Sequence, residues 1–194
     1  RDSSTSRGLG DVYKRQSKPR YIWIDAAANF PDFANSKENI ARDLALAKDA
    51  GFTDIVVDVR PTTGDVLFKT NLVDQVKFMY AWIGSNYTKV ERTATWDYLQ
   101  AFVDEARKQG LRIHAAINTF VGGNQIDGGT GLLYRDQSKA EWATQMNMQV
   151  GITSVMNTSE STKFFNPAHP EVQTFLCDLL KDLAGYDLDG IFLD

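Results

Sequence analysis

The sequence predicts an α/β protein that forms the N-terminal half, about the first four strands, of a (β/α)₈ barrel and stops at the end of strand four. Three observations support this. Four apolar runs alternate with three segments of helical periodicity, each helical segment ends at a glycine before the next run, and two of the loops after the runs are long. Alternating strands and helices form a parallel sheet, and long loops after the strands are typical of barrel enzymes.

The four predicted strands are short runs rich in β-branched and aromatic residues. They cover residues 21–25, 54–60, 111–118 and 190–194. Nearly continuous apolar runs are the pattern of strands that are covered on both faces. We therefore expect the strands to lie parallel, with their carboxyl ends at one rim.

Three helices are predicted between these strands from apolar residues at helical spacing. Asn35 or Ser36 can cap the first, the second starts near Thr95, and the third begins after Pro167 and Pro170. The helices end at Gly51, Gly110 and Gly185. The residues expected to be buried are Ile40, Leu44, Ala47, Leu99, Phe102, Val103, Ala106, Val172, Phe175, Leu176, Leu179 and Leu183.

Two long insertions, 61–94 and 119–166, follow the second and third strands. The first is rich in aromatic residues and the second in glycine, and a short helix is expected at about 139–148. A doubly wound sheet is the alternative architecture, but it normally has a glycine-rich phosphate turn directly after strand one. Residues 26–30 read Ala-Ala-Ala-Asn-Phe there, so the barrel is favoured.

The 194-residue chain is expected to be a piece of a longer protein, because a complete barrel takes roughly 250 residues and four strands make half of one. Such a piece exposes two sheet edges and is expected to be poorly soluble alone. Residues 1–16 resemble translated adapter sequence from environmental sequencing and are taken as non-native. Residues 17–194 form the predicted partial barrel domain.

The composition makes several partners improbable. The net charge is −4 and no run of Lys or Arg exceeds two residues, so nucleic acid is not an expected partner. No stretch approaches the roughly 18 apolar residues of a membrane span. The single Cys177 allows no internal disulfide, and its helical apolar surroundings predict a buried side chain.

Reacting groups of barrel enzymes lie at the carboxyl ends of the strands. The candidates at these positions are Asp25, Asp58, Arg60, Asn118 and Asp194. Asp194 can serve as a nucleophile, or as a general acid if burial raises its pKa, and a carboxylate that caps a following helix is the alternative. Asp58 and Arg60 share a face of one strand, where they either position sugar hydroxyls or form a structural ion pair.

Aromatic side chains in or beside the insertions favour a carbohydrate ligand, because flat rings suit stacking on sugar rings. They are Trp82, Trp96, Tyr87, Trp142 and Tyr134, and packing within the loops is the alternative for each. Trp82 and Trp96 are the substrate-binding candidates among them.

Other kinds of site find no support in the sequence. No Cys/His cluster suggests zinc, no Gly-x-Ser-x-Gly suggests a serine hydrolase, and no phosphate loop is found, so no metal or cofactor is expected. His114 lies in the middle of a strand and is expected to be a hydrogen-bonded core residue. Asp187 and Asp189 precede the last strand and are expected to be turn carboxylates.

Several stretches of the chain, which together span about residues 18–194, resemble the bacterial glycosyl-hydrolase-like family 10. They are 20–24, 50–52, 57–61, 64–68, 97–100, 110–115 with Asn118, 166–172 and 186–194. The resemblance implies a (β/α)₈ barrel that acts on O-glycosidic bonds in the cell envelope, in the periplasm or outside the cell. It also implies that Asp194 is catalytic and that a second carboxylate belongs to the later strands.

The full-length protein is therefore expected to be a glycoside hydrolase that cleaves a polysaccharide or bacterial envelope glycan through two carboxylates. Asp194 is one of them, and the other rim residues shape the sugar subsite. A glycan-binding barrel without catalysis is the alternative, because only one strong rim carboxylate is visible. A sugar-phosphate or nucleotide enzyme on a doubly wound sheet is a third, weaker hypothesis. The 194-residue chain alone is expected to be inactive.

Overall fold

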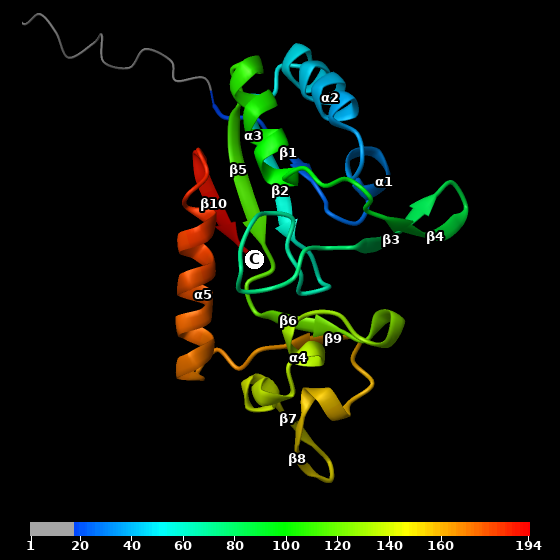
Figure 1. The fold of residues 1–194 in the computed structure, drawn as a ribbon, viewed down its shortest axis with the longest axis vertical. Coiled ribbons are helices and arrows are strands. Elements are labelled where there is room, and N and C mark those ends of the chain that lie inside the picture. Colours follow the sequence, from blue (N-terminus) through cyan, green and yellow to red (C-terminus); the bar gives the residue numbers. More distant parts are fainter. Residues whose placement is uncertain (1–17) are drawn as a thin grey trace, which may run out of the picture.

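The computed structural model describes residues 18–194, and its centre is a four-stranded parallel sheet (Figure 1). The strands are β1 (Tyr21–Ile24), β2 (Asp54–Arg60), β5 (Arg112–Ile117) and β10 (Gly190–Leu193), paired in that order. All four predicted strands are present, and the predicted α/β class with a parallel sheet is confirmed. The proposed non-native segment 1–16 lies outside the described residues.

Three longer helices connect these strands: α2 (Lys37–Asp49), α3 (Tyr98–Gln109) and α5 (Pro170–Leu183). A one-turn helix, α1 (Phe30–Phe33), precedes α2. In Figure 1, α2 and α3 lie next to each other against the sheet, and α5 stands at the left of the sheet and leads up into β10. Every residue predicted for the buried helix faces is buried, so the helical periodicity was a reliable guide to the core.

The helix ends follow the chemistry of their capping residues. Ser36 rather than Asn35 caps α2, because its hydroxyl accepts the backbone N–H of Asn39 at 3.1 Å. Asn35 instead binds the segment before α3, and its Oδ1 accepts the N–H groups of residues 93 and 94. Asp97 caps α3, and Gly110 ends it with a φ of +68°, a conformation that glycine adopts without strain.

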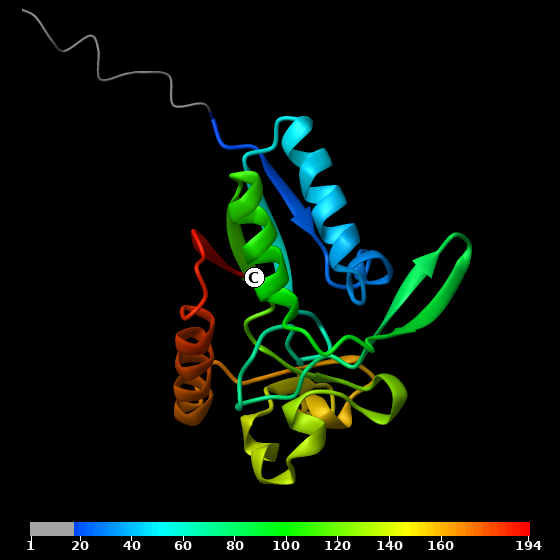
Figure 2. The same cartoon turned by 45° about the horizontal axis from the view of Figure 1, so that its top comes forward.

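The two insertions contain small antiparallel sheets. The first holds the hairpin of β3 (Phe78–Ile83) and β4 (Asn86–Glu91). The second forms a small lobe at the carboxyl ends of the central strands (Figure 2). Its elements are β6 (Val121–Asn124), η1 (Ile126–Gly128), α4 (Leu132–Arg135), η2 (Gln137–Trp142), β7 (Gln145–Met148), β8 (Gly151–Ser154), η3 (Val155–Asn157) and β9 (Thr162–Phe164).

Two local predictions are wrong. The short helix expected at 139–148 is a 3₁₀ turn followed by β7, because residues 145–148 pair with β8 across a turn that ends at Gly151, with φ +119°. Cys177 is exposed rather than buried. The buried stripe of α5 runs through Val172, Phe175 and Leu179, and Cys177 lies to one side of it.

A polar network joins the amino ends of the strands. Asp54 is fully buried and accepts Nε and Nη2 of Arg112, both at 2.7 Å, and Nε2 of His114 at 2.8 Å. His114 is thus the hydrogen-bonded core residue that was predicted. Asp187 and Asp189 lie in the turn before β10, where both bind the guanidinium of Arg107, as expected of turn carboxylates. These contacts are structural and lie away from the strand ends that form the candidate site.

Candidate active site

Four polar side chains meet where the central strands end. Asp25 follows β1, Asp58 lies near the end of β2, Asn118 follows β5, and Asp194 follows β10. Parallel strands place their carboxyl ends at one rim, and these four side chains line a single cavity of about 180 Å³. The structure therefore brings together four of the five predicted rim residues, three of them carboxylates.

Asp58 is the buried member of this group, with 8% of its surface exposed. Its Oδ1 accepts the backbone N–H of Arg60 at 3.1 Å. Burial raises the pKa of Asp58 to about 7, the charges of Asp25 and Asp194 add to the rise, and backbone N–H groups of Arg60 and Ala26 oppose it. When it carries a proton, this carboxyl can donate as well as accept a hydrogen bond.

Asp25 and Asp194 are the exposed members. Oδ1 of Asp25 accepts the backbone N–H groups of Ala27 at 2.8 Å and Ala28 at 2.7 Å, which fixes the side chain at the end of β1. The backbone of Asp194 donates to the carbonyl of Ile117 at 3.0 Å and accepts from the N–H of Thr119 at 2.9 Å. Pairing with the β5 segment thus positions Asp194, whose exposed side chain is accessible to a ligand.

Arg60 departs from the prediction, because its side chain is fully buried and does not line the cavity. Its guanidinium donates to the backbone carbonyls of Asn118, Thr119 and Val121. Burial lowers the pKa of Arg60 to about 10. The pairing of β2 with β5 shifts register between Asp58 and Arg60, so the simple alternation used in the prediction does not hold here. Arg60 stabilises the segment that leaves β5.

Asn118 is oriented by this arrangement. Its side-chain Nδ2 donates to the backbone carbonyl of Arg60 at 2.9 Å, while the backbone carbonyl of Asn118 accepts from the Arg60 guanidinium. The ends of β2 and β5 are therefore tied together in both directions. This reciprocal contact positions Asn118 in the lining of the cavity.

The two tryptophans predicted to stack on sugar lie outside the cavity lined by Asp25, Asp58 and Asp194, which is called the acidic cavity below. Trp82 is on the β3–β4 hairpin and is 69% exposed. Trp96 lines a separate cavity of about 720 Å³, where the guanidinium of Arg92 lies over its ring at 5.1 Å. Trp23 is the tryptophan that lines the acidic cavity, and the prediction missed it. Its place two residues before Asp25, on the same strand face, was the available signal.

Tyr98 places a buried hydroxyl within electrostatic reach of the cavity. Its side chain is 1% exposed, and the hydroxyl has no hydrogen-bond partner within residues 18–194. Burial raises the pKa of Tyr98, and the charges of Asp58 and Asp25 raise it further. Nothing in the sequence separates Tyr98 from the other core aromatics of α3, so this residue was not predicted.

Within 18–194, no group of three or more His, Cys, Asp or Glu side chains is arranged to hold a metal ion. No helix in the same range has the length and apolar character needed to cross a membrane.

The family assignment follows from a sequence match over this whole region. The family model described as glycosyl hydrolase-like 10 matches residues 18–194. The chain belongs to this family. An S-layer-related protein from Niallia circulans is 30% identical to this chain over 193 residues. That alignment covers 94% of this chain but 12% of the relative's length, so the chain spans a small part of this relative.

Solved structures of carbohydrate-active enzymes share the fold of this family member at low sequence identity. α-L-Fucosidase isoenzyme 2 from Paenibacillus thiaminolyticus is 19% identical with a TM-score of 0.56, covering 90% of this chain and 23% of that one. Isomaltulose synthase from Klebsiella sp. LX3 is 13% identical with a TM-score of 0.58, and the match covers 91% of this chain and 34% of that one. An α-amylase from Lactobacillus plantarum is 17% identical with a TM-score of 0.55, and the match covers 91% of this chain and 38% of that one. These matches show a shared α/β fold.

Proposed function

We propose that residues 18–194 belong to a glycoside hydrolase that cleaves glycosidic bonds of a polysaccharide or a bacterial envelope glycan. One observation carries the proposal: Asp25, Asp58 and Asp194 converge on one cavity at the carboxyl ends of parallel strands in a member of a glycosyl hydrolase-like family. Paired carboxylates are the groups that glycoside hydrolysis needs.

Asp194 acts as a catalytic carboxylate in this proposal. It is the exposed carboxylate at the end of β10, and its backbone N–H and carbonyl pair with Ile117 of β5 and with Thr119 just after it. Asp25, Asp58 and Asn118 bind sugar hydroxyls around it. Burial raises the pKa of Asp58, and in its protonated form it gives this subsite a carboxyl donor beside carboxylate acceptors. Trp23 adds an aromatic face to the same cavity.

We further propose that the four-stranded sheet is the first half of a (β/α)₈ barrel. Tyr21 and Trp23 on β1 and Phe192 on β10 form a cluster of rings on one face of the sheet, and they are 47%, 47% and 37% exposed. In a barrel this face is interior and filled by side chains of the remaining strands. The solved structures above match 90–91% of this chain with 23–38% of their own.

A cell-envelope or secreted location, including the periplasm, fits this function. The proposal rests on the name of the Niallia circulans relative, an S-layer-related protein. An envelope protein would meet glycan polymers directly, which agrees with a carbohydrate polymer as the partner.

Substitution of Asp194 in the full-length protein tests the catalytic role. Asp194→Asn keeps the size of the side chain but removes the charge, so turnover of an aryl glycoside or a polysaccharide should fall by at least about 1,000-fold. The matched control is Asp178→Asn on α5, where Asp178 pairs with Lys181 alone among residues 18–194. Unchanged turnover in the Asp194 variant would remove Asp194 from the mechanism.

A glycan-binding barrel without catalysis is the second candidate function. The surroundings of Asp58 and Asp25 favour it, because neither carboxyl is free to act as a second catalytic group. Asp58 is buried, and Oδ1 of Asp25 accepts two backbone N–H groups. The same assay separates the two functions. Saturable glycan binding by the full-length protein without release of reducing ends would support the binding module.

A further inference from the structure

The acidic cavity contains three carboxylates and no basic side chain. The residues that line it besides Asp25, Asp58 and Asp194 are apolar or uncharged, Trp23 and Asn118 among them. In the part of the chain that the structure describes, no Lys, Arg or His forms an ion pair with any of the three. Acidic groups that are buried in proteins are ordinarily paired with a basic group. The described residues therefore leave this cavity without a counter-charge.

Arg60 is the basic residue two positions from Asp58, but it does not supply that charge. Its guanidinium donates to the backbone carbonyls of Asn118, Thr119 and Val121 and lies outside the lining of the cavity. Burial raises the pKa of Asp58, and the charges of Asp25 and Asp194 raise it further. The carboxylates thus act on one another as uncompensated like charges.

The spread of the carboxylates along the rim indicates what kind of cation suits them. They belong to the ends of β1, β2 and β10, and β5 lies between the last two strands. Among residues 18–194, such side chains are not arranged to hold a metal ion. The cavity has a volume of about 180 Å³, which suits one sugar unit better than several. A positive charge carried on a sugar is therefore a better match than a free metal ion.

The donors of an amino sugar fit this lining. An ammonium group carries three N–H donors and a positive charge, and ionised carboxylates only accept hydrogen bonds. The ring of Trp23 adds a face over which a cation can lie. An N-acetyl group offers one uncharged N–H in place of the ammonium, and the carboxylate of an acidic sugar would be repelled. We propose that the acidic cavity selects a hexosamine unit with a free amine over N-acetylated and acidic sugars.

This selectivity rests on the proposed function and names its substrate class, a glycan that contains de-N-acetylated hexosamine. Monosaccharides test it without a choice of linkage. The probes are glucosamine, galactosamine, their N-acetyl forms and glucuronate, titrated onto the full-length protein at pH 6, where the amines are protonated. Ligand-observed NMR by saturation transfer measures each affinity. At least one amine should bind about tenfold or more tightly than its N-acetyl form, and glucuronate should not bind saturably.

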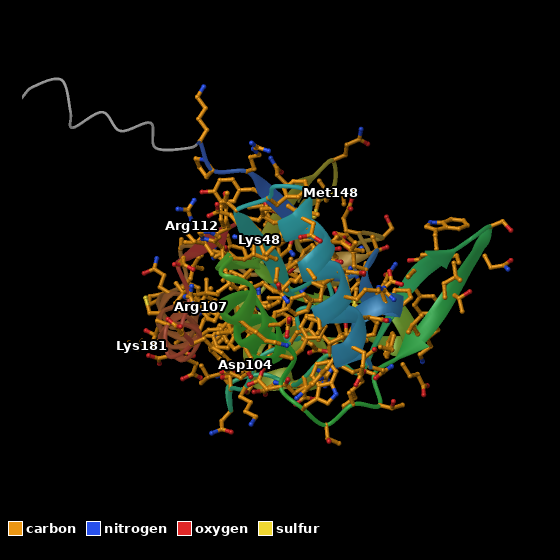
Figure 3. All side chains as sticks on the ribbon, turned by 90° about the horizontal axis from the view of Figure 1, so that it is seen from above. Lys48, Asp104, Arg107, Arg112, Met148 and Lys181 are labelled. Carbon is orange, nitrogen blue, oxygen red and sulfur yellow. The ribbon has the colours of Figure 1, made fainter. Side chains whose placement is uncertain are left out.

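Charge-removing variants locate the preference in the cavity. Asp25→Asn keeps an oxygen that can accept the N–H groups of Ala27 and Ala28, so the end of β1 should stay in place. This variant and Asp194→Asn should each lower the preference for the amine over the N-acetyl form by about tenfold. The control is Asp104→Asn on α3, labelled in Figure 3, because Asp104 is exposed and binds Gln100 of its own helix. It changes the net charge equally and should leave the preference unchanged.

The outcomes separate this proposal from the proposed function. Equal affinity for amine and N-acetyl forms, or no binding of either amine at about 50 mM, would overturn the amine selectivity. So would an equal loss of preference in the Asp104 control. If the selectivity fails while Asp194→Asn still abolishes turnover, the proposed hydrolase stands. If the amine preference holds in a protein that releases no reducing ends, the selectivity stands and the hydrolase fails.

Discussion

Asp58 is buried beside two like charges, and its titration should be visible in the stability of the protein. Its pKa is about 7 in the folded state, against about 3.9 for an ordinary Asp in an unfolded chain. A raised folded pKa means that the folded state binds the proton more tightly. Stability from this group is therefore fully present below pH 4 and is lost as the pH rises to 7.

Asp58→Asn should remove this pH dependence, because the amide stays neutral and its oxygen can still accept the Arg60 N–H. At pH 8 the variant should be more stable than the natural protein by up to about 4 kcal/mol. Urea unfolding at pH 4, 6 and 8 measures the difference. Asp104→Asn, on the exposed side of α3, is the control. Parallel stability profiles for Asp58→Asn and the natural protein would contradict the assigned pKa.

For single residues, the sequence predicted well which side chains lie together at the rim. It predicted less well the role of each side chain there. The position rule for barrel strands selected Asp25, Asp58, Asn118 and Asp194, and these line one cavity. It also selected Arg60, which the register shift in β2 directs into the protein. A bulge depends on pairing with a neighbouring strand, so residue types on one strand cannot reveal it.

The polar network at the amino ends of the strands is where the sheet should be most sensitive to acid. The hydrogen bonds from Arg112 lower the pKa of Asp54, and those from Thr53 and His114 act in the same direction. A depressed pKa contributes stability that is present above the unfolded value of about 3.9 and is lost as the pH falls toward the folded value. The junction of β2 and β5 should therefore weaken in strong acid.

Asp54→Asn should destabilise the protein by about 2 kcal/mol at pH 7, through lost charge-assisted hydrogen bonds. The difference in unfolding free energy between the variant and the natural protein should be smaller at pH 2.5, because Asp54 loses part of its stabilising effect as the pH falls toward its folded pKa. Urea midpoints at the two pH values provide the measurement, again with Asp104→Asn as the control. An equal difference at both pH values would mean that the charge of Asp54 is not the source of the stability.

At the level of elements, predictions held wherever a local pattern agreed with the tertiary fold. The helical stripes of α2, α3 and α5 are long enough to fix both the helix and its buried face. Residues 145–148 are too short a segment for that, and pairing with β8 overrides their local preference. The aromatic content of the first insertion was visible, but its arrangement as a hairpin depends on cross-strand pairs that periodicity did not reveal.

For the whole molecule, the open face of the sheet is the feature with the largest consequence. Phe192 lies 5.6 Å from the ring of Trp23 and 6.1 Å from that of Tyr21, so the exposed rings form one cluster rather than isolated surface groups. Within the described residues, β1 pairs only with β2 and β10 only with β5, which leaves two free sheet edges. A clustered apolar face between free edges favours association of one copy with another.

The 194-residue chain should therefore self-associate at micromolar concentrations, and Phe192→Ser should reduce this by removing the centre of the cluster. Leu46→Ser is the matched control, because Leu46 is 59% exposed on the outer side of α2, away from the open face. Sedimentation velocity over a concentration series, with circular dichroism to verify folding, distinguishes the two variants. If the natural chain is a monomer that melts cooperatively at every concentration, the open face needs no further strands and the half-barrel proposal fails. If only Phe192→Ser lowers association, the exposed rings are the interior surface that the half-barrel architecture requires.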